Sequence, residues 1–260
     1  MKNFAWGESN TSELGNQPFV WYNLSMNVLT SVGILLLLTL ILAFLQMVPG
    51  IFMLISHYAS GKFSRRKASD LALFFILGVE SGVVFFLVAV YAMLSALSLT
   101  NLNFDNGVLS WMMVGVLVAL GVMFPIYYYR RGEGTQTFIS RKFARQIHNK
   151  AENVKLRTDA LVLGFSALIP ELIFTMPLLI VADIEIMRAG ETTLARAGLM
   201  MAVALMAILP LIVMHALFGS GWNAAELERS RVKMKKCLKF LIPLLYILIA
   251  AIIVIFRILP

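Results

Sequence analysis

The sequence predicts an all-α polytopic membrane protein whose six transmembrane helices form two inverted three-helix repeats, with both termini outside. Three observations predict this class: the hydropathy of the chain, the length of its apolar runs and the placement of its basic residues. Of the 260 residues, 60% are hydrophobic and 14% are charged, whereas a soluble domain has about 25% charged residues. The mean hydropathy is +0.83. Such a chain is stable only with lipid as its main solvent.

Six apolar runs are long enough to cross the hydrocarbon layer, which takes about 20 residues of helix. The first run is too long for one straight helix, and Pro49 and Gly50 are expected to break it. Prolines inside the later runs predict kinks. The predicted spans are Leu29–Tyr58, Leu71–Leu97, Val108–Tyr129, Ala160–Ala182, Ala197–Phe218 and Phe240–Phe256.

The basic residues alternate between the two sides of these spans. Eighteen of the 22 Lys and Arg residues lie in the segments that follow the first, third and fifth spans. The remaining four are Lys2, Arg188, Arg196 and Arg257. Because Lys and Arg accumulate in cytoplasmic loops, we expect these three loops in the cytoplasm and both termini outside, in the plasma membrane of a prokaryotic cell.

This topology divides the chain into four segments. Residues 1–28 form an external tail, 29–129 the first repeat, 130–159 a basic cytoplasmic loop and 160–260 the second repeat. Within the loop, apolar residues recur at helical spacing between basic ones over 138–150, which predicts an amphipathic helix on the membrane surface. A solvated charged linker is the alternative.

The repeat itself is indicated by two segments that lie 121 residues apart. Residues 43–49 and 164–170 share, in register, a small residue, a phenylalanine, a β-branched residue and a proline. Each segment lies in the first span of a three-span half, so the second half enters the membrane from the opposite side. Inverted repeats of this kind organise many secondary transporters, whose binding sites lie near the midplane at broken helices. A chance match is the alternative.

Glu171 is the first candidate for a functional site, because an ionisable group deep in a membrane is costly to bury. It follows Pro170 midway along its span, and on one continuous helix it shares a small, polar face with Gly164, Ala167 and Thr175. Such a carboxyl group can carry a proton or bind a cation. A protonated glutamate hydrogen-bonded across a helix interface is the structural alternative.

Three further polar residues are candidates for a substrate or proton pathway. Glu80 lies between Gly78 and Gly82, a glycine spacing that allows another helix to approach closely but does not explain a carboxylate. His215 can relay protons or be an interfacial histidine with a satisfied hydrogen bond. Gln46, shortly before Pro49, is the expected counterpart of the Glu171 site in the first repeat.

Several functional classes are excluded by the sequence. The net charge of +8 resides in short loops, which argues against nucleic-acid binding. Cys237 is the single cysteine, so no internal disulfide or thiolate cluster forms. No nucleophile elbow, HExxH or Walker motif occurs, so we expect no enzyme activity and no cofactor. The 15 methionines show no repeated metal-binding spacing, and the sequence identifies no metal site.

The stretch Met47–Gly50, the basic segment Gly61–Lys67 and the pair Leu77-Gly78 resemble the first half of the CcdA/DsbD transmembrane family. That family belongs to the superfamily of LysE-type exporters, and the resemblance covers residues 41–97 and, more faintly, 160–218. It implies two inverted three-helix repeats and alternating-access transport. In thiol-reducing members a cysteine precedes the proline of each half. Val48 and Ile169 occupy these positions here, which argues against disulfide electron transport.

Two functions follow from these observations. The first is a secondary transporter, an exporter of a small polar or cationic solute, coupled to protons through Glu80 and Glu171, with helix breaks at Pro49 and Pro170. The second is a membrane subunit or assembly factor that binds a partner protein and transports nothing. The expected partners are the bilayer, a small molecule or ion, and either further copies of the chain or another membrane protein.

Overall fold

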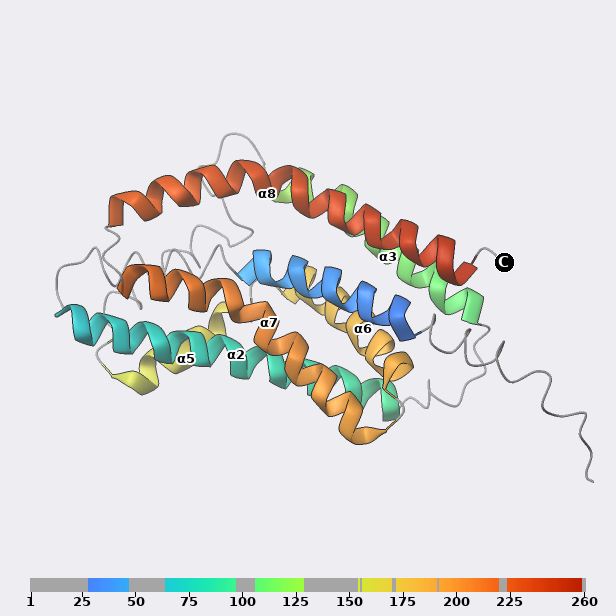
Figure 1. The fold of residues 1–260 in the computed structure, drawn as a ribbon, viewed down its shortest axis with the longest axis horizontal. Helices are drawn as coiled ribbons and strands as arrows, with labels where there is room; N and C mark the ends of the chain where they lie inside the picture. Colours follow the sequence, from blue (N-terminus) through green and yellow to red (C-terminus); the bar gives the residue numbers. More distant parts are fainter. Residues whose placement is uncertain are drawn as a thin grey trace, which may run out of the picture.

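The computed structural model describes residues 28–46, 64–96, 106–128, 154, 156–169, 172–190, 192–219 and 224–258, and the regular elements in these ranges are all helices. They pack side by side along the long axis of the molecule (Figure 1). The elements are the first helix Val28–Gln46, α2 (Arg65–Ala96), α3 (Asn106–Tyr128), α5 (Arg157–Ala167), α6 (Leu172–Ala189), α7 (Thr193–Gly219), α8 (Ala224–Ile253) and the π-helix η2 (Val254–Ile258).

Five of the described helices are long and apolar enough to cross a membrane, which indicates a multi-pass membrane protein. They are Val28–Gln46, Arg66–Ala96, Gly107–Ile126, Thr193–Leu217 and Phe240–Ile258. No more than half of each apolar window is buried in the bundle. The outward faces carry large exposed apolar side chains such as Phe85 and Leu209, which a lipid environment accommodates and water does not.

The fourth predicted span, Ala160–Ala182, differs from the expected single helix. The structure has α5, which ends at Ala167 and is followed by a short turn, and then α6, which begins at Leu172. Pro170 explains an interruption here, because a proline disfavours helical conformation in the residue before it. The predicted face shared by Gly164 and Thr175 is therefore divided between two helices. Six spans and an inverted repeat remain predictions.

The apolar part of the last helix begins at Phe240, where the sixth span was predicted to begin, but the helix itself begins earlier. The helix α8 starts at Ala224, so the basic segment from Arg229 to Lys239 is helical and continuous with the apolar part. The first helix is described only to Gln46. The predicted break at Pro49 and Gly50, the external tail and the amphipathic segment 138–150 lie outside the described residues.

The glycines of α2 allow close helix packing, as the sequence predicts, and the partner is α5. A Cβ atom at Gly78 would lie 2.1 Å from the carbonyl oxygen of Leu161, and one at Gly164 would lie 2.1 Å from that of Phe75. The two backbones are thus in contact through two facing glycines. The contact continues at Gly82, against which the Leu168 side chain packs, since a Cβ at Gly82 would meet Leu168 Cδ1 at 2.3 Å.

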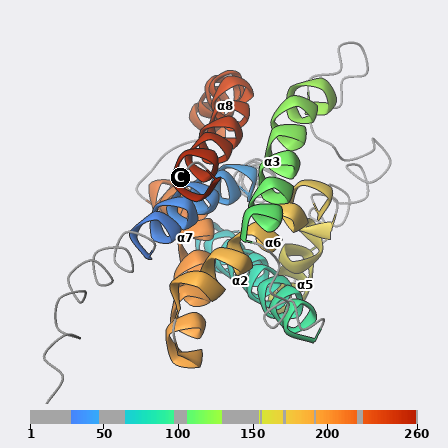
Figure 2. The ribbon, with the colours of Figure 1, turned by 90° about the vertical axis from the view of Figure 1, so that its right-hand side faces the viewer.

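The helix α6 lies inside the bundle and contacts α2, α3 and α7. The end-on view shows α3 and α8 together on one side of the molecule and α2 with α5 on the other (Figure 2). Pro177, Pro210 and Pro243 lie within α6, α7 and α8, as expected, and α7 bends partway along its length (Figure 1). The central position of α6 matters because most of its polar residues are consequently buried.

A short connection holds the end of α6 against the start of α7. The Gly190 amide donates to Ile186 O at 2.9 Å, and Arg196 Nε donates to Gly190 O at 2.8 Å. Thr192 Oγ1 accepts a hydrogen bond from the Ala195 amide at 3.1 Å, which satisfies a free donor of the first turn of α7. The last turn of α6 is therefore fixed in place.

Candidate functional site

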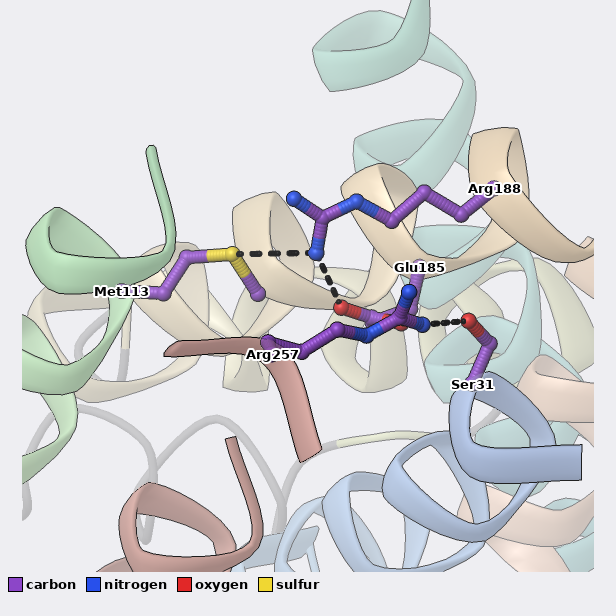
Figure 3. A network of polar contacts seen from close by, with 5 residues as sticks. All are labelled: Ser31, Met113, Glu185, Arg188 and Arg257. Carbon is purple, nitrogen blue, oxygen red and sulfur yellow. Dashed lines mark hydrogen bonds and ion pairs between the residues drawn. The ribbon is translucent and has the colours of Figure 1, made fainter. Parts of the chain in front are cut away.

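Two arginines and one glutamate meet in the interior near the predicted outer end of the bundle. Glu185 Oε1 lies 2.8 Å from Arg188 Nη1, and Glu185 Oε2 lies 3.3 Å from Arg257 Nη2 (Figure 3). Arg257 Nη2 also donates to the Ser31 hydroxyl at 2.5 Å. We call these four residues the arginine cluster. Its members come from α6, η2 and the first helix, so the cluster joins three segments distant in sequence.

The local structure explains how these side chains meet. Glu185 and Arg188 lie three residues apart on α6, which places them on one helix face. Arg257 projects from the π-helical turn η2 that ends the last span. Met113 of α3 borders the cluster, since its sulfur lies 3.9 Å from Arg188 Nη1. The Glu185 carboxylate therefore accepts hydrogen bonds from two guanidinium groups in a largely apolar setting.

Asp183 is buried two residues before Glu185 and belongs to a different side of α6. Successive helix residues are rotated by about 100°, so two positions apart face nearly opposite directions. Asp183 is fully buried, and neither of its carboxylate oxygens has a hydrogen-bond partner in the described part of the chain. A buried carboxylate without donors is stable only when it is protonated or when a cation lies beside it.

Glu80 lies on the face of α2 that contacts α7. Ser69, Glu80 and Tyr91 are spaced by eleven residues, which returns a helix to nearly the same face. Ser69 Oγ lies 3.4 Å from His215 Nε2 of α7, and Arg196 Nη1 of α7 donates to the Tyr91 hydroxyl at 3.4 Å. Glu80 lies midway between these contacts, and its buried Oε2 has no partner among the described residues.

The structure separates two of the predicted site residues, His215 and Glu80. His215 is paired with Ser69, which lies about 16 Å along α2 from Glu80 at 1.5 Å of rise per residue. Gln46 and Thr175 are buried, and their Nε2 and Oγ1 atoms have no hydrogen-bond partner in the described ranges. Glu171, Pro170, Pro49 and Gly50 lie outside those ranges.

His215 lines a basin of about 980 Å³ at the predicted cytoplasmic end, where α2, α5 and α7 meet. Arg157 crosses this basin, because its Nε lies 2.7 Å from Asp70 Oδ2 and its guanidinium carbon lies 5.3 Å from the centre of the Phe74 ring. The remaining lining residues are Ser64, Arg66, Lys67, Ser69 and Leu73. Among the residues described, no three His, Cys, Asp or Glu side chains are grouped as metal ligands.

The arginine cluster and Asp183 were not predicted from the sequence. The fourth span was predicted to end at Ala182, and Arg188 and Arg257 were expected to be charges of the outer segments. A signal was present: the charged residues of α6 are Asp183, Glu185 and Arg188, all near the end of an apolar run, and the last two have the spacing of a helical ion pair. In the sequence, Arg257 is likewise the single charged residue of the apolar run that begins at Phe240.

Comparisons with known proteins identify no relative: no protein-family model, no curated protein and no solved structure matches this chain.

Proposed function

We propose that this chain is a secondary transporter of the plasma membrane, which moves a small polar solute in exchange for protons. Asp183 and Glu80 are the proton-exchanging groups in this proposal, and Glu171 remains a predicted third. The observation that carries it is Asp183, which is fully buried in an apolar bundle with both carboxylate oxygens unpartnered within the described ranges. A buried carboxyl group that has only a structural role is normally hydrogen-bonded to donors of the protein.

The physical chemistry of such a group suits alternating access. In the closed bundle Asp183 is stable as the neutral acid, because ionisation without a donor or counter-ion is strongly disfavoured. When one side of the bundle opens, water reaches the carboxyl group and it releases its proton. A group whose charge depends on which side is open links proton movement to the conformational cycle.

The helix arrangement supports the same proposal. The polar face of α2, with Glu80 at its centre, meets α7, and α2 is joined to α5 by direct backbone packing. The helix α5 is short, and α6 starts only after an interruption near the middle of the fourth predicted span. Broken helices at mid-membrane are where transporters of inverted-repeat design place their binding sites.

Proteoliposomes that contain the pH-sensitive dye pyranine test this function. We expect at least one of choline, glycine, malonate and phosphate to drive a change of internal pH with the native chain. Asp183→Asn is expected to reduce this proton movement at least about tenfold, a typical loss for a proton-transfer group. Glu80→Gln is expected to act in the same direction.

Asp159→Asn is the matched control, because Asp159 is an exposed carboxylate in the first turn of α5. Its proton movement is expected to equal that of the native chain. Unchanged proton movement in Asp183→Asn would refute the coupling role. A native chain that moves no proton with any solute, and that purifies in mild detergent with a stoichiometric partner protein, would favour the partner-binding subunit.

A further inference from the structure

The basin beside His215 lies at the depth where two membrane-spanning helices end. The apolar span of α2 begins at Arg66, and the span of α7 ends at Leu217, two residues beyond His215. Arg66 and His215 both line the basin. Because the hydrocarbon layer covers only the apolar part of each span, the basin lies at the level of the lipid headgroups.

The basin is on the outer surface of α2, between α5 and α7. Gly78 lies on the face of α2 that contacts α5, and Ser69 lies on the face that contacts α7. At about 100° per residue, Arg66, Leu73 and Leu77 lie between these two faces. Both leucines are 45% exposed. A ligand in the basin is therefore at the outside of the bundle, where lipid lies, and away from any path through its interior.

Basic side chains outnumber acidic ones among the described residues that line the basin. The acidic member is Asp70, and the basic members are Arg66, Lys67 and Arg157. Asp70 is paired with Arg157. Arg66 is exposed and makes no hydrogen bond or ion pair within the described ranges. Counting only the two arginines, the lining still carries one more positive than negative charge, so it attracts anions.

Arg157 holds its guanidinium group in a fixed position at the basin. Its Nε donates to Asp70 Oδ2 at 2.7 Å, and its guanidinium carbon lies 5.3 Å from the centre of the Phe74 ring. The two terminal nitrogens, Nη1 and Nη2, make no hydrogen bond in the described part of the chain. The side chain is 64% exposed. A guanidinium group with both terminal nitrogens available matches two oxygens of a phosphate.

The start of α2 also favours an anion in the basin. Ser64 precedes the helix, and its hydroxyl accepts a hydrogen bond from the Lys67 amide at 3.4 Å. The N-terminal end of a helix favours negative charge, yet the first turn of α2 contains no acidic residue and includes Arg66 and Lys67. A bound anion would compensate both the helix end and these cations.

We propose that this basin binds the phosphate group of an anionic phospholipid, with Arg66 and Arg157 as the phosphate ligands. Leu73 and Leu77 continue from the basin along the same exposed face of α2, so they lie beneath the acyl chains of that lipid. A water-soluble phosphate has no part that matches this apolar continuation. Basic pockets between membrane helices on the cytoplasmic side are known to hold lipid headgroups. The inference does not depend on the transport function proposed above.

Native mass spectrometry of the full chain in detergent tests this site. The chain is titrated with phosphatidylglycerol, or with phosphatidylcholine of the same acyl chains, and the dissociation constant of the first bound lipid is measured. We expect phosphatidylglycerol to bind at least about tenfold more tightly, because the choline group cancels the charge of its phosphate. Arg157→Gln should weaken phosphatidylglycerol binding about tenfold, because it removes a charge-assisted contact. Arg66→Gln should weaken it about fivefold, the usual contribution of one cation at a membrane surface.

Two variants separate a positioned site from general positive charge. Arg229→Gln is the matched control, since it removes an exposed arginine of α8 that does not line the basin, and its affinity for phosphatidylglycerol should be native. Arg157→Lys keeps the charge without the fork of donors, and it should bind at least about threefold more weakly than the native chain. Equal losses in Arg229→Gln and Arg157→Gln would mean that the attraction is diffuse, and native affinity in Arg157→Lys would contradict a guanidinium contact.

Glycerol 3-phosphate distinguishes a lipid from a soluble ligand, because it carries a phosphate group without acyl chains. In large excess over the lipid, it is expected to leave phosphatidylglycerol bound. If it displaces the lipid, the basin is a site for a water-soluble phosphate and the inference is wrong. Equal affinity of the native chain for the two phospholipids would also overturn it. Lipid binding is measured here without a solute gradient, so none of these results bears on the proton movement proposed for Asp183 and Glu80.

Discussion

Glu185→Leu is expected to lower the free energy of unfolding by about 3–5 kcal/mol, because it leaves two largely buried guanidinium groups without their carboxylate. Arg188 and Arg257 both donate to Glu185, whose side chain is completely buried. Water cannot replace the lost acceptor at that depth. Reversible unfolding of the purified chain in one detergent, followed by circular dichroism, measures the loss.

Two comparisons assign the effect to unpaired charge. Asp70→Asn breaks the ion pair with Arg157, but this pair is 37% and 64% exposed, so we expect a loss of at most about 1 kcal/mol. Combining Glu185→Leu with Arg188→Met and Arg257→Met removes both cations and should restore much of the lost stability, because apolar residues often replace a buried ionic cluster without loss. A triple variant as unstable as Glu185→Leu would show that packing and not charge is responsible.

The class of the protein could be predicted from the sequence, because hydropathy over about 20 residues depends on composition alone. The second, third, fifth and sixth predicted spans correspond to described helices long enough to cross a membrane, and the described helix Val28–Gln46 matches the start of the first predicted span. The helix boundaries were less predictable. The basic segment before Phe240 was expected to be a loop, yet Lys and Arg are good helix formers and α8 extends through it.

The break between α5 and α6 was only partly predictable. Pro170 predicts a kink, but a proline within an apolar run is compatible with either a bent helix or two helices. Whether the segment forms one bent helix or two helices depends on packing. The helix α5 is held to α2 by facing glycines, whereas α6 contacts α2, α3 and α7. Gly78 and Gly82 indicated that some helix approaches α2 closely. Which helix does so is a property of the tertiary structure.

The candidate site was the least predictable part, for a physical reason. Arg188 and Arg257 are near the ends of apolar runs, where arginines ordinarily reach water, so the sequence favours an exposed position for both. Their burial depends on η2 and α6 meeting in space, although Arg257 and Glu185 are 72 residues apart. Glu80 and His215 were recognised because they lie within their spans. Their separate environments follow from the pairing of α2 with α7.

Gly164→Ala is expected to destabilise the chain by about 3 kcal/mol or more, at or above the usual range for overpacked interiors. The added Cβ would lie 2.1 Å from Phe75 O and 3.0 Å from Val79 N. These are backbone atoms of another helix, so they cannot move aside as a flexible side chain would, and α2 and α5 must separate. Gly78→Ala meets Leu161 O at the same distance and should have the same effect.

The double variant Gly78→Ala with Gly164→Ala should lose less than the two single losses together, because helices that one substitution has already separated no longer clash at the second. Gly198→Ala is the control: it makes the same change inside α7, where no atom lies within 4 Å of the new Cβ, and alanine is the better helix former by about 1 kcal/mol. Its stability should therefore equal or exceed that of the native chain.

Unfolding titrations of the four variants in one detergent measure these differences. A Gly164→Ala protein as stable as Gly198→Ala would mean that α2 and α5 do not meet backbone to backbone. The helix α2 also presents Glu80 to α7. If Gly164→Ala displaces α5 and lowers stability but leaves proton movement at the native level, the interface that moves during transport is the one between α2 and α7.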